Sequence, residues 1–128
     1  MRLLLDTHVL IWALTEPKHL ADSTRRQIEN PDNEVLFSAA SIWEIAIKSG
    51  LGRADFQLHP NQIAQAALAS GFTELPVSAE AASHVIALPP HHRDPFDRLL
   101  IAQAMTEPAI FFTADRQLDI YSDLVRAA

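Results

Sequence analysis

Short, almost wholly apolar runs alternate along the chain with longer segments in which apolar residues recur every three or four positions. Runs of the first kind predict strands buried on both faces of a sheet. These strands are Arg2–Leu5, Glu34–Phe37, Phe72–Val77 and Ala109–Phe112. Segments of the second kind predict helices: Thr7–Leu14, Asp22 or Ser23 to Glu29, Ala39–Ser49, Pro60–Gly71, Ala79–Leu88, and Asp94 to Met105. The tail, 116–128, predicts a short helix and an edge strand.

This alternation predicts the fold class. Strands without polar alternation, each followed by a helix, are typical of a parallel sheet with helices on both faces. We therefore expect an α/β protein, a three-layer α/β/α sandwich with a central, mostly parallel sheet of four to five strands. At 128 residues, with no repeat or linker that would divide it, the chain is expected to form a single domain over residues 1–128.

Composition excludes several classes of site. Without cysteine there is no disulfide, thiolate zinc site or cysteine nucleophile. Three glycines exclude a glycine-rich phosphate loop. The net charge of −6 argues against a broad basic face for nucleic acid, so a phosphodiester substrate would require bound cations or a local basic patch. With neither a membrane-spanning run nor a cleavable signal, the chain is expected to be cytoplasmic.

Four acidic residues follow strands or open the next helix, where open α/β sheets bind their ligands. Asp6 and Asp115 follow the first and last apolar strands, whereas Glu44 and Asp97 lie in the helices 39–49 and 94–105. Converging carboxylates without interleaved lysine or arginine would repel one another, and a divalent cation would relieve the repulsion. Oxygen ligands suit Mg²⁺ or Mn²⁺, which can polarise a phosphoryl group and activate water. The pattern favours phosphodiester hydrolysis.

Each acid also has a structural interpretation. Asp6, Asp94 and Asp115 could cap helices, and Asp97 could interact with a helix dipole. Glu44 could form a capping box with Ser41 or an ion pair with Lys48. His91 and His92 lack the spacing of a metal-binding pair, and Trp12 and Trp43 favour core or interface positions.

Four segments together carry a family resemblance. They are LLLDTH at 3–8, SAASIWEIAIK at 38–48, HRDPFDRLLIAQA at 92–104 and FTAD at 112–115. In their order and spread they resemble a PIN-domain ribonuclease of the VapC toxin family. The resemblance implies a catalytic cluster of Asp6, Glu44, Asp97 and Asp115, with metal held by Asp6, Asp97 and Asp115.

The resemblance further implies Mg²⁺- or Mn²⁺-dependent cleavage of RNA that leaves a 5′-phosphate and a 3′-hydroxyl. Thr7 and Thr113 match supporting hydroxyl positions beside the acids. A homodimer and a separately encoded antitoxin are the implied partners, with no membrane association. Candidate phosphate contacts are Arg93, Arg98 and Lys48, and also Arg53 and Arg116.

Two other functions remain open from the sequence. A Mg²⁺-dependent phosphatase or phosphoryl-transfer domain would use Asp6 as a covalent nucleophile. A non-catalytic interaction module would use the acids only as helix caps and the apolar helices as an interface.

Overall fold

A computed structural model describes residues 1–52, 57–90 and 94–128 of the chain. Its strands are β1 (Arg2–Leu5), β2 (Glu34–Ser38), β3 (Thr73–Leu75), β4 (Ile110–Thr113) and β5 (Val125–Ala127). Its α-helices are α1 (Thr7–Thr15), α2 (Asp22–Glu29), α3 (Ala39–Gly50), α4 (Pro60–Ala69), α5 (Ala79–His84) and α6 (Pro95–Thr106). Three short 3₁₀ helices, η1 (Pro17–His19), η3 (Val85–Ala87) and η4 (Arg116–Tyr121), complete the described elements.

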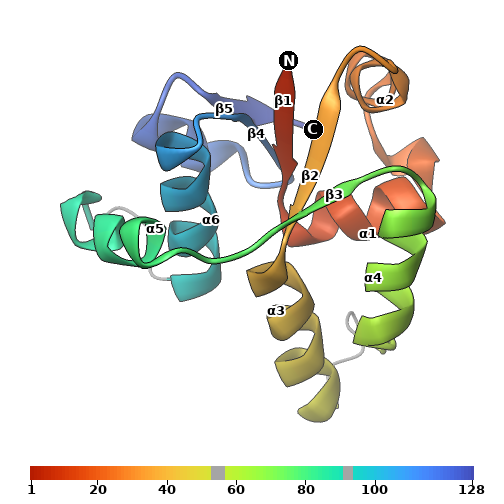
Figure 1. Cartoon of the computed structure of the whole chain (residues 1–128), viewed down its shortest axis with the longest axis horizontal. Coiled ribbons are helices and arrows are strands. Elements are labelled where there is room, and N and C mark those ends of the chain that lie inside the picture. Colours follow the sequence, from red (N-terminus) through yellow and green to blue (C-terminus); the bar gives the residue numbers. More distant parts are fainter. Residues whose placement is uncertain (53–56, 91–93) are drawn as a thin grey trace.

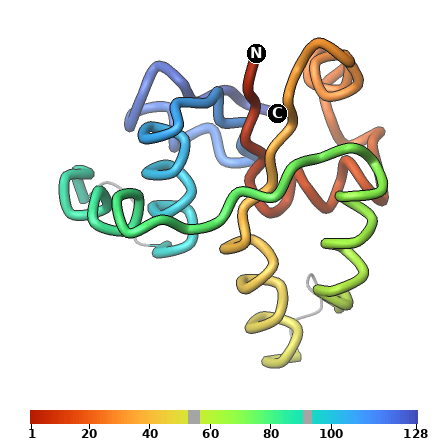
Figure 2. The backbone as a smooth tube through the Cα atoms, viewed as in Figure 1, coloured from red at the N-terminus to blue at the C-terminus, as the bar shows by residue number. Residues whose placement is uncertain are grey.

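The five strands form one sheet in the order β3-β2-β1-β4-β5, and every pairing is parallel. The chain runs outward from β1 through β2 to β3, then returns to place β4 on the other side of β1. Open parallel sheets bind ligands beyond the carboxyl ends of their strands at such a reversal. In Figures 1 and 2, β1 and β2 both descend to the same lower end of the sheet, where α1 and α3 begin.

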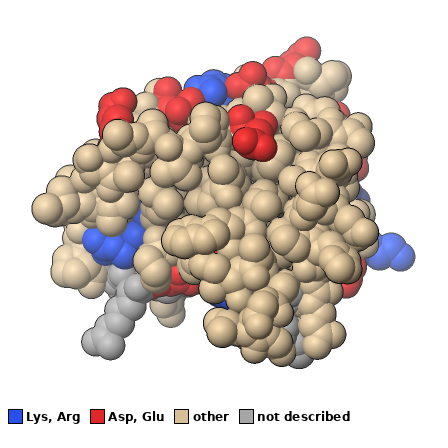
Figure 3. All heavy atoms as spheres, turned by 60° about the horizontal axis from the view of Figure 1, so that its bottom comes forward, with Lys and Arg blue, Asp and Glu red and all other residues tan. Residues whose placement is uncertain are grey.

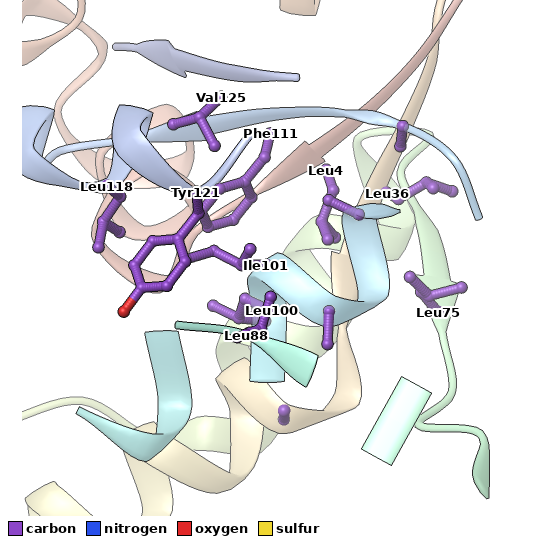
Figure 4. Close-up of a cluster of buried hydrophobic side chains, with 14 residues drawn as sticks. Leu4, Leu36, Leu75, Leu88, Leu100, Ile101, Phe111, Leu118, Tyr121 and Val125 are labelled. Carbon is purple, nitrogen blue, oxygen red and sulfur yellow. The ribbon is translucent and has the colours of Figure 1, made fainter. Parts of the chain in front are cut away.

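Alternate side chains of the central strand enter two separate cores. Leu4 packs with Phe111 and Ile101 on the face covered by α5 and α6, as Figure 4 shows. Leu3 and Leu5 pack on the opposite face with residues of α1, α3 and α4. Helices lie on both sides of the sheet in Figure 1, so the structure confirms the predicted three-layer α/β/α sandwich.

The predicted elements all occur, and two of them differ markedly from their predicted bounds. The expected strand 72–77 is reduced to β3, an edge strand that begins after Gly71, whose φ of +88° favours glycine. The expected helix 79–88 divides into α5 and η3 at Val85. Helix α3 is capped by Ser38, which accepts a hydrogen bond from the Ala40 N–H. None of the helices in the described part of the chain is long and apolar enough to span a bilayer.

Candidate functional site

The site begins where β1 and β4 end side by side. Leu5 pairs with Phe112, and the N–H of Asp6 donates to the Phe112 carbonyl at 2.9 Å. The register therefore places Asp6 next to Thr113, the last residue of β4. Two residues that lie more than a hundred positions apart in the sequence are brought together by one strand pairing.

Asp6 is a nearly fully buried carboxylate, 4% exposed. It caps α1 by accepting a hydrogen bond from the Val9 N–H at 2.8 Å, and its other oxygen accepts from the Ala114 N–H at 2.8 Å. Burial raises the pKa of the Asp6 carboxyl, whereas hydrogen bonds from Thr113 and from these two backbone groups oppose the rise. The predicted capping role is confirmed, and it fixes the orientation of the carboxylate.

Thr113 links two of the candidate acids. Its hydroxyl hydrogen-bonds to Asp6 and accepts a bond from the N–H of Asp115 at 3.0 Å. Asp115 in turn caps η4, accepting a hydrogen bond from the Gln117 N–H at 2.9 Å. The predicted contact between Thr113 and a carboxylate is therefore present.

Glu44 is held by side chains from two helices. It is 3% exposed, on the face of α3 toward α1. The Thr7 hydroxyl donates to Glu44 Oε1 at 2.6 Å, and Lys48 Nζ lies 2.5 Å from Glu44 Oε2. Of the two structural interpretations, the ion pair with Lys48 is confirmed. The capping box is wrong, because the N-cap of α3 is Ser38 and Ser41 lies inside the helix, buried, with its hydroxyl 3.0 Å from that of Thr7.

Helix α6 contributes two further acids to the site from its N-terminus. Asp94 caps the helix as predicted, accepting a hydrogen bond from the Phe96 N–H at 2.9 Å. Asp97 lies one turn further on and is half-buried. Both acids face the same cleft as Asp6 and Glu44.

The four predicted acids all line one cleft of about 420 Å³ at the carboxyl end of the sheet. Thr7, Lys48, Asp94 and His8 line it too. The last two were not predicted as site residues, although His8 lies soon after the end of β1 and Asp94 caps the helix that carries Asp97. Lys48 also corrects the expectation that no basic residue is interleaved among the acids.

The lining is rich in oxygen donors, which fits a hard divalent cation. Within the residues that the structure describes, no three His, Asp or Glu side chains converge closely enough to form a complete ligand set. That arrangement fits Mg²⁺, which is commonly held by one or two carboxylates and keeps several waters. These residues therefore do not surround a metal ion with protein ligands alone.

Arg98 contacts backbone carbonyls, and its phosphate contact stays a prediction. Its guanidinium donates to the carbonyls of Pro89, Val85 and Leu88 at 2.9 to 3.3 Å, and it does not line the cleft. Arg98 thus satisfies carbonyls at the end of η3, which the sequence pattern could not show. Arg116 is exposed outside the cleft. Arg53, His91, His92 and Arg93 lie outside the described residues.

A second cavity, of about 500 Å³, lies near the amino end of β2, between α1, α2 and the turn after α4. Its charged lining residues are Arg25 and Glu29. It therefore lacks the converging acids of the cleft, and the chemistry suggested by the sequence belongs to the smaller site.

The fold and the cleft define a class of protein. It is a parallel α/β sandwich with acidic residues gathered where the strand order reverses. The family model for the PIN domain matches residues 3–124, and the chain belongs to the PIN-domain family. PIN-domain proteins are generally nucleases that use divalent metal ions. No curated protein sequence gives a significant match.

Solved structures of toxin–antitoxin complexes share the fold. VapBC2 from Rickettsia felis, bound to a promoter DNA fragment, contains a chain with a TM-score of 0.72 and 16% identity, covering 99% of this chain and 98% of that one. VapBC-1 from nontypeable Haemophilus influenzae contains a chain with a TM-score of 0.63 and 16% identity, covering 99% of this chain and 98% of that one. A toxin–antitoxin complex from Klebsiella pneumoniae contains a chain with a TM-score of 0.61 and 19% identity, covering 97% of this chain and 95% of that one.

Proposed function

We propose that this chain, as one PIN domain over residues 1–128, is a Mg²⁺- or Mn²⁺-dependent endoribonuclease and the toxin of a type II toxin–antitoxin pair of the VapC kind. The observation that carries the proposal is the meeting of Asp6, Glu44, Asp97 and Asp115 in one cleft at the strand reversal of a PIN fold. The likeness to VapBC complexes supports the toxin assignment.

In the proposed site, Asp6, Asp97 and Asp115 would hold the cation, one or two of them directly and the rest through waters that the cation retains. When bound, a divalent cation neutralises phosphate charge and makes a water molecule a better nucleophile. Backbone N–H groups fix Asp6 from two sides, so its orientation is set before any ligand enters. This preorganisation lowers the cost of assembling the site.

The chain's own residues would direct the attack of water. Glu44, oriented by Thr7 and Lys48, positions the water and accepts its proton as the oxygen bonds to phosphorus. The bond from phosphorus to the 3′ oxygen then breaks, and that oxygen takes a proton from solvent. The products are a 5′-phosphate and a 3′-hydroxyl.

End-group analysis tests this reaction. Fragments from RNA incubated with the chain and Mg²⁺ are expected to be substrates for a 5′-phosphate-dependent exonuclease. Fragments ending in 2′,3′-cyclic phosphate would instead show attack by the RNA's own 2′-hydroxyl and contradict the proposed hydrolysis.

The phosphatase alternative predicts a different product. A covalent nucleophile at Asp6 would retain phosphate on the protein after reaction with a phosphomonoester. We expect no such labelling, because Asp6 would hold the cation in the proposed site and a water molecule would be the nucleophile. Acid-stable mass addition at Asp6 would favour the phosphatase.

Thr7→Val tests how Glu44 is oriented. Valine keeps the shape of threonine but removes the 2.6 Å hydrogen bond to Glu44. Loss of a group that orients a site carboxylate typically reduces activity by about 10- to 100-fold, so we expect a fall of this size in kcat for RNA cleavage. Thr24→Val, at another buried threonine outside the cleft, is the control for folding. Equal activity of the two variants would contradict the proposed positioning of Glu44.

Arg98→Met tests whether Arg98 acts through its contacts with backbone carbonyls. The variant leaves carbonyls at the end of η3 without their donor, so the free energy of unfolding is expected to fall by about 1–2 kcal/mol. Cleavage per folded molecule is expected to stay within about twofold of the wild type, since Arg98 is not part of the cleft lining. Denaturant unfolding and kcat/KM measure the two effects. A large rise in KM with unchanged stability would favour the predicted phosphate contact instead.

Partners follow from the same assignment. We propose a cognate antitoxin protein, as in the VapBC complexes that share this fold. We also propose a homodimer, supported by an exposed apolar stripe along α3. Trp43, Ile47 and Leu51 are 59%, 37% and 73% exposed at successive four-residue intervals on this helix and its C-cap. Sedimentation of the purified chain would measure its oligomeric state.

A further inference from the structure

The described residues that line the cleft offer RNA few ionic contacts. Among the lining residues that the structure describes, Lys48 is the single lysine or arginine, against five carboxylates. Its ammonium group is already paired with Glu44 at 2.5 Å. On the face drawn in Figure 3, the Lys and Arg atoms form no continuous band. RNA affinity at this cleft is therefore expected to need non-ionic contacts as well as a cation.

A row of three aromatic rings begins at the cleft and leads away from the carboxylates. His8, in the first turn of α1, lines the cleft. Trp12 follows one turn later, with its ring centroid 6.0 Å from that of His8 and the planes tilted by 52°. His19 stacks on Trp12 at 5.3 Å, with the planes only 18° apart.

The fold holds this row in place. Trp12 is half-buried and packs against the core that contains Leu3, Leu5 and Val9. His19 is itself held by Glu16, whose carboxylate lies 2.7 Å from Nε2. Ring contacts that already exist in the folded chain reduce the entropy lost when a ligand binds to them.

We propose that His8, backed by Trp12, is a stacking site for the nucleobase adjacent to the scissile phosphate. The inference rests on the proposed ribonuclease function and adds to it how single-stranded RNA is held. Unpaired bases are commonly bound by stacking on His, Phe, Tyr or Trp side chains. Such contacts are compatible with an acidic cleft, because they need no positive charge from the protein.

An abasic scan of the substrate tests the proposal. An RNA oligonucleotide that the wild-type chain cleaves is prepared in a series, each member lacking one base. For the wild type, removal of one base next to the cleaved bond is expected to raise KM about tenfold, with kcat nearly unchanged. His8→Ala is expected to raise KM on the intact RNA by a similar factor. Removal of that base is expected to raise the KM of this variant no further. Non-additivity of this kind marks two groups that contact each other.

Matched variants separate stacking from folding. His8→Phe keeps a ring and is expected to keep the base-dependent KM. His59→Ala, at an exposed histidine before α4, is expected to behave as the wild type. Thermal unfolding of each variant shows whether it is folded.

Three results would overturn the inference. The first is a KM of His8→Ala equal to that of the wild type, and the second is additive losses from the variant and the abasic position. The third is a fall in kcat alone, which would assign His8 to the support of Asp6. All three results require that the wild-type chain cleaves RNA, so they contradict the stacking site and leave the proposed function standing. Intact RNA after incubation with the wild-type chain contradicts the proposed function itself, so the two failures are distinguishable.

Discussion

Replacing Asp97 with Asn is expected to reduce metal-dependent RNA cleavage by about a thousandfold, the scale of the several kcal/mol that a metal ion contributes to stabilising charge in the transition state. Asp97 lines the cleft from the first turn of α6, where the substitution changes charge but hardly changes shape. The fold is expected to tolerate it, with a loss of about 0.3–1 kcal/mol from the helix dipole.

The matched control for this experiment is Asp119→Asn. Asp119 is an exposed acid of η4 that lies outside the cleft, so its loss removes one negative charge without touching the site. Initial cleavage rates of both variants are measured on one RNA at saturating Mg²⁺. Activity of Asp97→Asn within about threefold of the control would contradict the role of the carboxylate.

The second large effect is stabilisation of the folded chain by the cation itself. Metal that binds only the native state at about one hundred times its Kd adds about 2.7 kcal/mol to the free energy of unfolding. Mg²⁺ or Mn²⁺ is therefore expected to raise the Tm of the wild type and of Asp119→Asn, and to have little effect on Asp97→Asn. Equal shifts in all three proteins would show that metal binds elsewhere. This readout does not depend on finding the RNA target.

The stabilisation is expected to depend on pH in a definite direction. Burial raises the pKa of the Asp6 carboxyl in the metal-free fold, so protons compete with the cation and the metal-induced rise in Tm is smaller at acidic pH. Without metal, the contribution of Asp6 to the free energy of unfolding changes with pH in the opposite direction and falls as the pH rises. A carboxyl whose pKa is raised on folding loses its contribution to stability as pH rises from the unfolded value of about 3.9 through the folded value. Thermal scans with and without Mg²⁺ across pH 4–8 would measure both trends.

Residues near strand ends were the most predictable part of the site. Asp6 follows an apolar run that can only be a buried strand, and a parallel sheet brings its end beside that of β4. Asp94 followed by a proline predicts the start of a helix, and the structure confirms that Asp94 caps α6. In these cases the local pattern and the global fold require the same arrangement.

Contacts between helices were less predictable, because they depend on how each helix is rotated about its axis. The hydrogen bond from Thr7 to Glu44 joins α1 to α3, and no spacing in the sequence encodes it. The i,i+4 pair of Glu44 and Lys48 was recognisable, yet its position in the cleft was not. Arg98 follows Asp97 directly, but the next position on a helix points elsewhere, and its guanidinium binds carbonyls near η3.

The central claim is that the acidic cleft cleaves RNA with the help of a divalent cation. The most direct test incubates a mixed-sequence RNA with the purified chain, freed of any bound protein, in Mg²⁺ or Mn²⁺ and in excess EDTA. We expect cleavage with either metal, none in EDTA, and recovery when metal is restored. Cleavage that persists in EDTA, or intact RNA after incubation with folded, metal-loaded chain, would contradict it.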